Sequence, residues 1–143
     1  MKKLSVLIVD DNESDRYLLK RYLNKLENIG PIFEANDGQS ALDFFMENDN
    51  KAPKTIEGYP PVLVFLDVNM PIINGFDFLK KFAALREKQG HQTLVFMMLT
   101  SSGLVEERER ALAYPFVKDY ITKGQVDIEY LRKKVSEHCN SSE

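Results

Sequence analysis

The 143-residue sequence has one cysteine, no excess of basic residues and no long hydrophobic run, and each absence excludes a class of protein. The single cysteine, Cys139, cannot form an internal disulfide, which is typical of proteins in a reducing compartment. A formal net charge of −3 argues against direct nucleic-acid binding, which needs a basic face. No apolar stretch approaches the roughly 18 residues of a membrane span, and the start MKKLSVLIVDDNESD turns acidic too early for a signal peptide. We therefore expect a cytoplasmic protein that binds neither nucleic acid nor membrane.

What is present is a regular alternation of short apolar runs and segments of helical period. With 43% hydrophobic and 29% charged residues, the composition is that of one globular domain over residues 1–143. The predicted strands are Leu4–Val9, Ile32–Ala35, Val62–Leu66, Leu94–Leu99 and Phe116–Thr122, and the predicted helices are Ser14–Leu26, Gln39–Glu47, Phe76–Lys88, Val105–Ala113 and Ile128–His138. Because the strands are continuously apolar, both faces of the sheet must be covered. The prediction is an α/β, flavodoxin-like (βα)5 fold, with helices on both sides of a five-stranded parallel sheet.

Polar residues follow the predicted strands at their carboxyl ends. Asp10 and Asp11 follow the first strand, Asp67 the third, Thr100 the fourth, and Lys123 the fifth. In the common strand order 2-1-3-4-5, the first and third strands are neighbours, so three carboxylates share one pocket. Two like charges about 4 Å apart repel by about 4 kcal/mol at an effective dielectric of 20, so a cation is expected. Lys123 supplies one positive charge, and Mg²⁺ is the natural candidate for the rest.

This arrangement suits phosphoryl transfer to a carboxylate. A carboxylate held beside Mg²⁺ and a lysine can attack phosphorus, because the cations neutralise the phosphoryl oxygens. Asp67 is the predicted nucleophile, which would become an aspartyl phosphate. Thr100 could then donate a hydrogen bond to a phosphoryl oxygen, a contact that exists only in the phosphorylated protein, as in a switch.

The motifs VDDNESD, FLDVNMPIING, MMLTSS and DYITKG together resemble the receiver domain of two-component response regulators, of the stand-alone type without an output domain. The resemblance implies phosphotransfer to Asp67 from a sensor histidine kinase or a histidine phosphotransfer protein. It implies that Asp11 and Asp67 bind Mg²⁺ directly, Asp10 through water, and Asn69 through its backbone carbonyl. It also implies a signalling switch, not an enzyme, although such a domain catalyses its own phosphorylation and dephosphorylation.

The resemblance also assigns the switch and the output. Lys123 pairs with Asp67 and later with the phosphoryl group, while Thr100 and Tyr120 form the switch pair. Asn69 and Ser102 flank the path of the attacking water. The signal leaves through phosphorylation-dependent binding to an unknown downstream protein. A homodimer is possible through the face built by the fourth helix, the fifth strand and the fifth helix.

The sequence departs from the family pattern in several places, among them Gly124 and the segment Asn48–Pro60. Gly124 follows Lys123 where the family has proline, often after a cis bond, and a non-proline cis bond costs about 2.5 to 4 kcal/mol. The family's cis geometry is therefore in question at Lys123–Gly124. The segment Asn48–Pro60 is a longer loop than in chemotaxis-type regulators and is similar to that of phytochrome-associated response regulators.

Other interpretations of the same residues remain open. Asp10 could cap the first helix, Asn74-Gly75 could be only a turn, and Tyr120 could be a packing residue of an edge strand. Haloacid-dehalogenase phosphatases also use a strand-end aspartate, but they need a second aspartate where Asn69 stands. A flavodoxin-like cofactor carrier would need a hydroxyl-rich phosphate loop in place of DDNESD. A degenerate receiver would signal without phosphate, but the presence of Asp10, Asp11 and Asp67 together argues against this interpretation.

Overall fold

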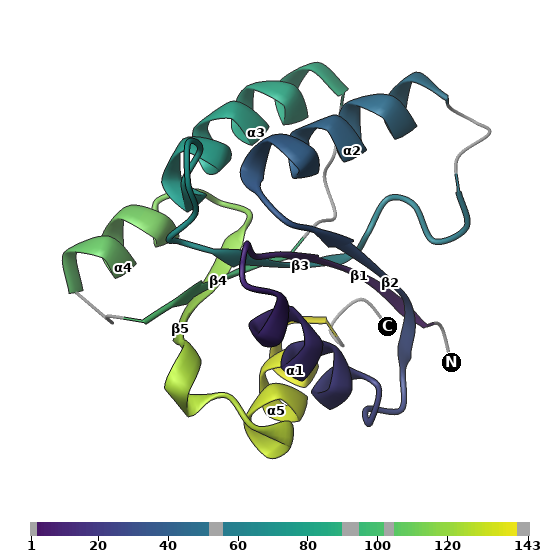
Figure 1. Ribbon diagram of the computed structural model, residues 1–143, viewed down its shortest axis with the longest axis vertical. Helices are drawn as coiled ribbons and strands as arrows, with labels where there is room; N and C mark the ends of the chain where they lie inside the picture. The colour runs from purple at the N-terminus through teal and green to yellow at the C-terminus, as the bar shows by residue number, and fades with distance from the viewer. Residues whose placement is uncertain (1–2, 52–55, 90–94, 102–104, 140–143) are drawn as a thin grey trace.

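The sheet has the predicted architecture. The computed structural model describes residues 3–51, 56–89, 95–101 and 105–139. The strands are β1 (Leu4–Val9), β2 (Ile29–Ala35), β3 (Leu63–Asp67), β4 (Val95–Thr100) and β5 (Val117–Thr122). They pair in parallel in the order β2-β1-β3-β4-β5 (Figure 1), which confirms the predicted fold and strand order.

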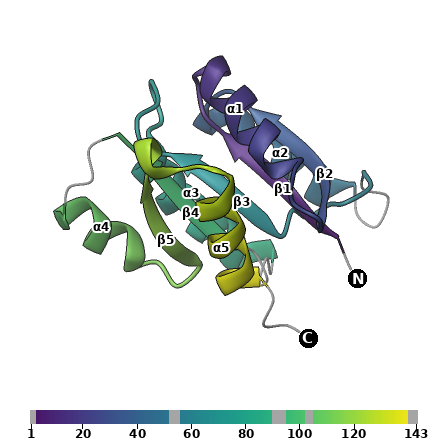
Figure 2. The same ribbon diagram turned by 90° about the horizontal axis from the view of Figure 1, so that it is seen from below.

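Helices cover both faces of this sheet. They are α1 (Glu13–Leu23), α2 (Gly38–Asn50), α3 (Gly75–Gln89), α4 (Val105–Leu112) and α5 (Ile128–Cys139), and a short 3-10 turn (Lys123–Gln125) follows β5. Figures 1 and 2 show α1 and α5 together on one face, with α2 and α3 on the other and α4 beside β5. The acidic and hydroxyl side chains at the strand ends are thus held on a rigid sheet between two helical layers.

The core is divided by the sheet into two layers, because successive strand residues point to opposite faces. Along β1, Leu7 and Val9 join the layer under α2 and α3, whereas Val6 and Ile8 join the layer under α1 and α5. The first layer is rich in aromatic rings, with Phe82 packed between Phe45, Phe96 and Phe116 at centroid distances of 4.9, 5.0 and 5.5 Å. Burial on both faces explains why the strands read as unbroken apolar runs.

Some element boundaries differ from the predicted ones. Helix α1 ends at Leu23, not Leu26, although Leu26 is buried just beyond the helix end and so continues the apolar period. Helix α2 starts at Gly38, one residue early, because the Asp37 side chain caps it by accepting from the Ser40 N–H at 2.7 Å. Strand β2 begins at Ile29, three residues early. It contains Pro31, which an edge strand tolerates because one of its sides is unpaired.

The other edge strand, β5, carries a buried charge. Asp119 is 6% exposed, and its carboxylate contacts Lys134 and His138 of α5 at 2.8 and 3.3 Å. It also accepts the Tyr120 N–H at 2.9 Å. Burial raises the pKa of Asp119, but the hydrogen bonds from Lys134 and the Tyr120 N–H outweigh it, so the net pKa is lowered. Asp119 therefore joins β5 to α5.

We expect Asp119→Asn to lower the free energy of unfolding by about 1 to 3 kcal/mol at pH 7, because hydrogen bonds to a buried charge are lost. A lowered pKa gives stability that is present above the unfolded value near 3.8 and is lost as the pH falls through the folded pKa. Urea unfolding should therefore show a smaller difference between parent and variant at pH 3.5 than at pH 7. Glu129→Gln, which removes an exposed pair with Arg132 on α5, should change stability by less than about 0.5 kcal/mol. Equal effects of the two substitutions would contradict this role of Asp119.

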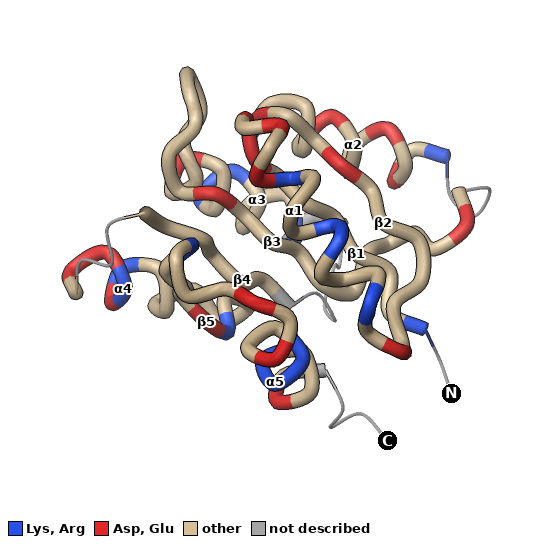
Figure 3. The backbone as a smooth tube through the Cα atoms, turned by 60° about the horizontal axis from the view of Figure 1, so that its bottom comes forward, with Lys and Arg blue, Asp and Glu red and all other residues tan. Residues whose placement is uncertain are grey.

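Charged residues are interspersed over the surface. Helices α1, α4 and α5 each carry both acidic and basic residues (Figure 3), so none of the three presents a single sign of charge. Among the described residues, no helix is both long and apolar enough to cross a membrane.

Candidate functional site

The site begins where β1 and β3 end side by side. The register pairs Val9 with Leu66, so the residues that follow, Asp10 and Asp67, are neighbours at the carboxyl edge. Both side chains are buried, with residue exposures of 2% and 3%. Carboxylate oxygens of Asp10, Asp11 and Asp67 lie within 4.8 Å of one another, and Asp11 is exposed. The three carboxylates that the sequence predicts as neighbours are therefore brought together.

The turn from β1 into α1 leaves the Asp10 carboxylate in this pocket. The cap of α1 is Asn12, whose Oδ1 accepts the Asp15 N–H at 2.9 Å, so the alternative interpretation of Asp10 as the cap is wrong. Asp10 Oδ1 instead accepts the Asn12 N–H at 2.9 Å. Arg16 Nη1 donates to the Asp10 carbonyl at 2.7 Å, and its Nε pairs with Glu34 at 3.1 Å. These contacts fix the turn that carries Asp10 and Asp11.

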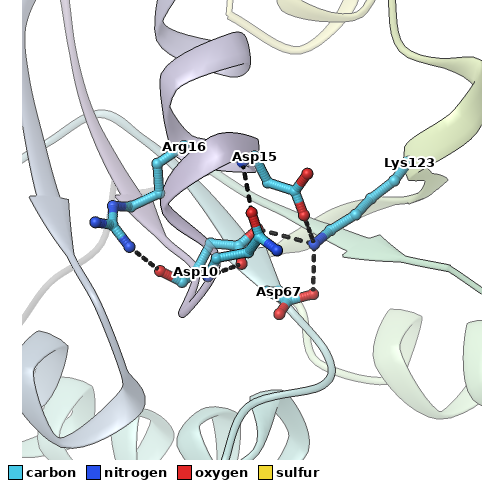
Figure 4. Close-up of polar contacts among 6 residues, drawn as sticks. Asp10, Asp15, Arg16, Asp67 and Lys123 are labelled. Carbon is cyan, nitrogen blue, oxygen red and sulfur yellow. Dashed lines mark hydrogen bonds and ion pairs between the residues drawn. The ribbon is translucent and has the colours of Figure 1, made fainter.

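Lys123 reaches into the pocket from the end of β5 and contacts three carboxylates (Figure 4). Its Nζ lies 2.9 Å from Asp10 Oδ2, 3.2 Å from Asp67 Oδ1 and 2.8 Å from Asp15 Oδ2. The contact with Asp15 is not predicted from the sequence. Its signal was present, because Asp15 lies one helical turn after Asp11 in VDDNESD, but an acidic residue in the first turn of a helix also has an ordinary structural explanation.

The crowded charges shift the pKa values of the site. Burial raises the pKa of Asp67 to about 6, the Asp10 carboxylate adds to the shift, and Lys123 opposes it. Burial alone would lower the pKa of Lys123, but the hydrogen bonds to Asp15 and Asp10 dominate and raise it. Lys123 is therefore held as a cation, whereas this one lysine does not offset the burial of Asp67 and its repulsion by Asp10. This donor set of three clustered carboxylates fits a hard divalent cation such as Mg²⁺, which prefers oxygen ligands.

The loop from β3 to α3 passes close under Asp67. A Cβ on Gly75 would lie 2.6 Å from the Asp67 carbonyl oxygen and 2.9 Å from Val68 Cα, so no larger side chain fits here. Asn74 caps α3 by accepting the Asp77 N–H at 2.9 Å. Asn74-Gly75 is thus more than a turn, since it lets the helix start against the backbone of Asp67.

The same loop carries an unusual residue, Ile72. It has a φ of 67° and is 99% exposed, although a β-branched residue is rarely found in the left-handed region. Neighbouring Ile73 packs against the apolar layer under α2 and contacts the backbone of Gly38 closely. The loop is therefore anchored through Ile73 while Ile72 is presented to solvent.

The predicted switch residues Thr100 and Tyr120 lie on adjacent strands and are both buried. The Tyr120 hydroxyl donates to Glu107 Oε1 of α4 at 2.6 Å. Burial and then this bond raise the pKa of Tyr120 to about 12, while a hydrogen bond with Thr100 acts in the opposite direction. Arg108 Nη1 donates to the Tyr120 carbonyl at 3.1 Å. Tyr120 therefore connects Thr100 to α4, and it is not merely an apolar packing residue of the edge strand.

The structure shows the backbone geometry at Lys123–Gly124, where the sequence departs from the family pattern. In the described part of the chain the cis peptide bond is Tyr59–Pro60, so Lys123–Gly124 is trans. A Cβ on Gly124 would meet no atom within 4 Å, so close packing does not require a glycine there. Ser102, the expected neighbour of the attacking water, lies outside the described residues.

A family profile and known sequences match most of this chain. The sequence profile of the response regulator receiver domain matches residues 6–136. The sensor protein EvgS of Escherichia coli K12 is 37% identical over 112 residues, which are 78% of this chain but 8% of the sensor protein. An uncharacterised 14.6 kDa protein of Leptolyngbya boryana is 28% identical over 139 residues, 97% of this chain and 92% of that protein. The chain thus spans a small part of the large sensor proteins and nearly all of the small relative.

Solved structures show the same fold. A two-component response regulator from Cytophaga hutchinsonii has a TM-score of 0.82 at 23% identity, covering 98% of this chain and 100% of that one. The receiver domain of Ssk1 from Saccharomyces cerevisiae, crystallised with the histidine phosphotransfer protein Ypd1, has a TM-score of 0.78 at 25% identity, covering 99% of this chain and 92% of that chain. With the family profile over most of its length, on the fold and acidic pocket described above, this chain belongs to the response regulator receiver domain family.

Proposed function

We propose that this receiver domain accepts a phosphoryl group on Asp67 in a Mg²⁺-dependent reaction and signals by phosphorylation-dependent binding to another protein. One observation carries the proposal. A buried carboxylate at the end of β3 lies among two further carboxylates and directly beside a lysine. Such under-compensated charge costs stability and is typical of functional sites.

The chemistry follows from the position of each side chain. An Asp67 oxygen attacks the phosphorus of the donor, and the electron pair of the broken bond leaves with the donor's nitrogen or oxygen. Asp11 and Asp67, with Asp10 through water and the Asn69 carbonyl, would hold Mg²⁺, which supplies charge neutralisation for the phosphoryl oxygens. Lys123 donates to Asp67 in the resting state, and after the transfer it donates to a phosphoryl oxygen. Thr100 donates to another phosphoryl oxygen.

The proposed protein donor is a sensor histidine kinase or a histidine phosphotransfer protein. The similarity to a receiver crystallised with Ypd1 supports this class of partner. A pocket beside the site is lined by Leu18, Leu19, Tyr22 and Val126, together with the Asp15 and Lys123 side chains. Leu18 is 45% exposed, and apolar surface next to a reacting carboxylate suits a protein donor that must press its histidine against Asp67.

The proposed output route is the face of α4, β5 and α5. Helix α4 buries Ala111 as its single buried residue, and polar contacts hold it otherwise: Glu107 and Arg108 bind Tyr120, and Arg110 lies 4.2 Å from the Phe76 ring centroid. A helix held by so few apolar contacts can be displaced at low cost. Movement of Thr100 toward a phosphoryl group therefore has a direct mechanical route to α4 through Tyr120. Partner binding and self-association through this face follow as proposals.

The test of the overall proposal is direct. Incubation with acetyl phosphate and Mg²⁺ should add one phosphoryl group, detected by intact-mass measurement, and omission of Mg²⁺ should abolish the gain. A phosphatase assay on small phosphate esters should show no turnover, since Asn69 replaces the acid/base aspartate of the haloacid-dehalogenase phosphatases. Failure to gain mass with any phosphodonor would refute the proposal.

For the output route, we expect beryllofluoride, which mimics a phosphoryl group on Asp67, to shift the NMR signals of Tyr120 and of Glu107 on α4. The reason is that Thr100 exchanges its hydrogen bond with Tyr120 for one to the mimic. Phe116 is a matched control on the same edge of the domain, because it is 5% exposed and fixed between Phe82 and Phe96. Fixed Tyr120 signals in a protein whose Asp67 pocket responds would rule out this route.

A further inference from the structure

Asp15 forms the shortest of the three ion pairs made by Lys123. The Nζ of Lys123 lies 2.8 Å from Asp15 and 3.2 Å from Asp67. The Asp15 side chain is 43% exposed, whereas the side chains of Asp10 and Asp67 are 2% and 4% exposed. Figure 4 shows Asp15 descending from α1 to the lysine, opposite Asp67. The lysine that must serve the phosphoryl group is thus shared with an outer carboxylate.

The fold does not require this side chain. Helix α1 is capped by Asn12, which binds the backbone N–H of Asp15 and not its carboxylate. Glu13 supplies a second acidic residue in the same first turn, so the helix dipole keeps a favourable charge without Asp15. The Asp15 carboxylate is directed instead to Lys123, and it lines the pocket that opens beside the phosphoacceptor.

We propose that Asp15 is a positioning residue that limits the rate at which anionic donors phosphorylate Asp67. It acts through its charge: the Asp15 carboxylate shares Lys123 with Asp67 and adds a negative charge on the approach of the donor. The inference rests on the proposed function of Asp67 as the phosphoacceptor. Asp15 is neither one of the proposed metal ligands nor one of the switch residues, so this role is additional to theirs.

The reaction to be measured is a complete transfer. An oxygen of Asp67 bonds to the phosphorus of acetyl phosphate, the bond from phosphorus to the acetate oxygen breaks, and its electron pair leaves on acetate. At neutral pH acetyl phosphate is a dianion, whereas phosphoramidate is a monoanion that transfers the same group and loses ammonia. Because electrostatic repulsion scales with charge, the effect of Asp15 on the activation free energy should be about twice as large for the dianion.

The experiment compares Asp15→Asn with the parent at saturating Mg²⁺ by intact-mass time courses. We expect the variant to react about threefold faster with phosphoramidate and about ninefold faster with acetyl phosphate. The repulsion between Asp15 and the donor is twice as large for the dianion, so the rate factor for the monoanion is squared. Both gains should decrease as salt screens the exposed charge. If Asp15 had only a structural role, Asp15→Asn would change the rates with the two donors by the same factor, whatever their charge.

Two further variants provide the controls. Asp15→Glu keeps the charge and should react at rates close to those of the parent. Glu13→Gln removes a charge from the same turn of α1, but no contact with Lys123, and should change either rate by less than about twofold. Equal acceleration of both donors by Asp15→Asn, or no acceleration, would overturn the role of Asp15. If the parent protein itself gains no phosphoryl group, the proposed function fails, and the inference fails with it.

Discussion

Asp67→Asn is expected to abolish phosphorylation and to make the metal-free protein more stable. The amide cannot attack phosphorus, so the gain of one phosphoryl group from acetyl phosphate should disappear from the intact-mass spectrum. At the same time a buried charge beside Asp10 is removed, while Lys123 keeps its contacts with Asp10 and Asp15. We expect a stability gain of about 1 to 3 kcal/mol at pH 7.5 without Mg²⁺, because desolvated like charges are relieved.

The pH dependence of this gain can be derived from the site. The pKa of Asp67 is raised from 3.8 to about 6 in the folded protein, so the parent loses stability as the pH rises through this interval. The amide introduced by Asp67→Asn does not titrate in this interval. The variant's advantage in urea unfolding should therefore be near zero at pH 4 and complete above pH 7. Asp43→Asn on the exposed face of α2 should be phosphorylated like the parent. Phosphorylation of the Asp67→Asn protein at another residue would show that the nucleophile is misassigned.

The second large effect is expected on metal binding. Asp11→Ala should reduce the affinity for Mg²⁺ at least about tenfold, because the proposed site would lose one of its few carboxylate ligands. The apo protein should remain folded, since Asp11 is exposed and its charge repels Asp10 and Asp67. Thermal melting with increasing Mg²⁺ measures this, because a ligand raises stability in proportion to the logarithm of its concentration over Kd.

Asp43→Ala is the matched control for metal binding, as it removes an exposed aspartate outside the acidic cluster. It should keep the Mg²⁺-dependent rise in melting temperature of the parent. If Asp11→Ala showed the same rise as the parent, Asp11 would not be a ligand. If it were unfolded without Mg²⁺, the acidic cluster would have a structural role that its mutual repulsion does not suggest.

The sheet and the strand-end residues could be predicted because their signals are local and strong. Continuous apolar runs mark strands covered on both faces, and the parallel order brings Asp10, Asp67 and Thr100 to one edge. The approach of Lys123 follows from the same topology. What the sequence does not carry is the direction of side chains on helices and in loops. Asp15 is an ordinary first-turn acid until the fold brings the start of α1 to Lys123, just after the end of β5.

Other features were hidden for physical reasons. Ile72 has the left-handed backbone conformation that usually indicates Asn or Gly in a sequence. The packing of the neighbouring Ile73 against the core overrides the backbone preference of isoleucine. Gly75 has the sequence signature of a turn, yet its requirement is the close passage of the chain beneath Asp67. Tyr120 fits a period-two strand equally well as packing or as a switch, and the strand pattern gives no sign of its hydrogen bond to Glu107. Its switch role stays a prediction. The resemblance to phytochrome-associated regulators stays a prediction.

The two edge strands limit how this domain can associate. Pro31 on β2 has no N–H to offer an added strand, and the backbone at Gly58 crosses close to it, since a Cβ there would lie 3.0 Å from the Pro31 ring. On β5, Asp119 is an inward-pointing charge that is ion-paired with α5, and the neighbouring Lys118 is exposed. Charged residues and proline at sheet edges oppose strand addition and the aggregation that follows from it. Binding through side chains of this domain, without addition of a strand, would let a complex form and separate with no rearrangement of backbone pairing.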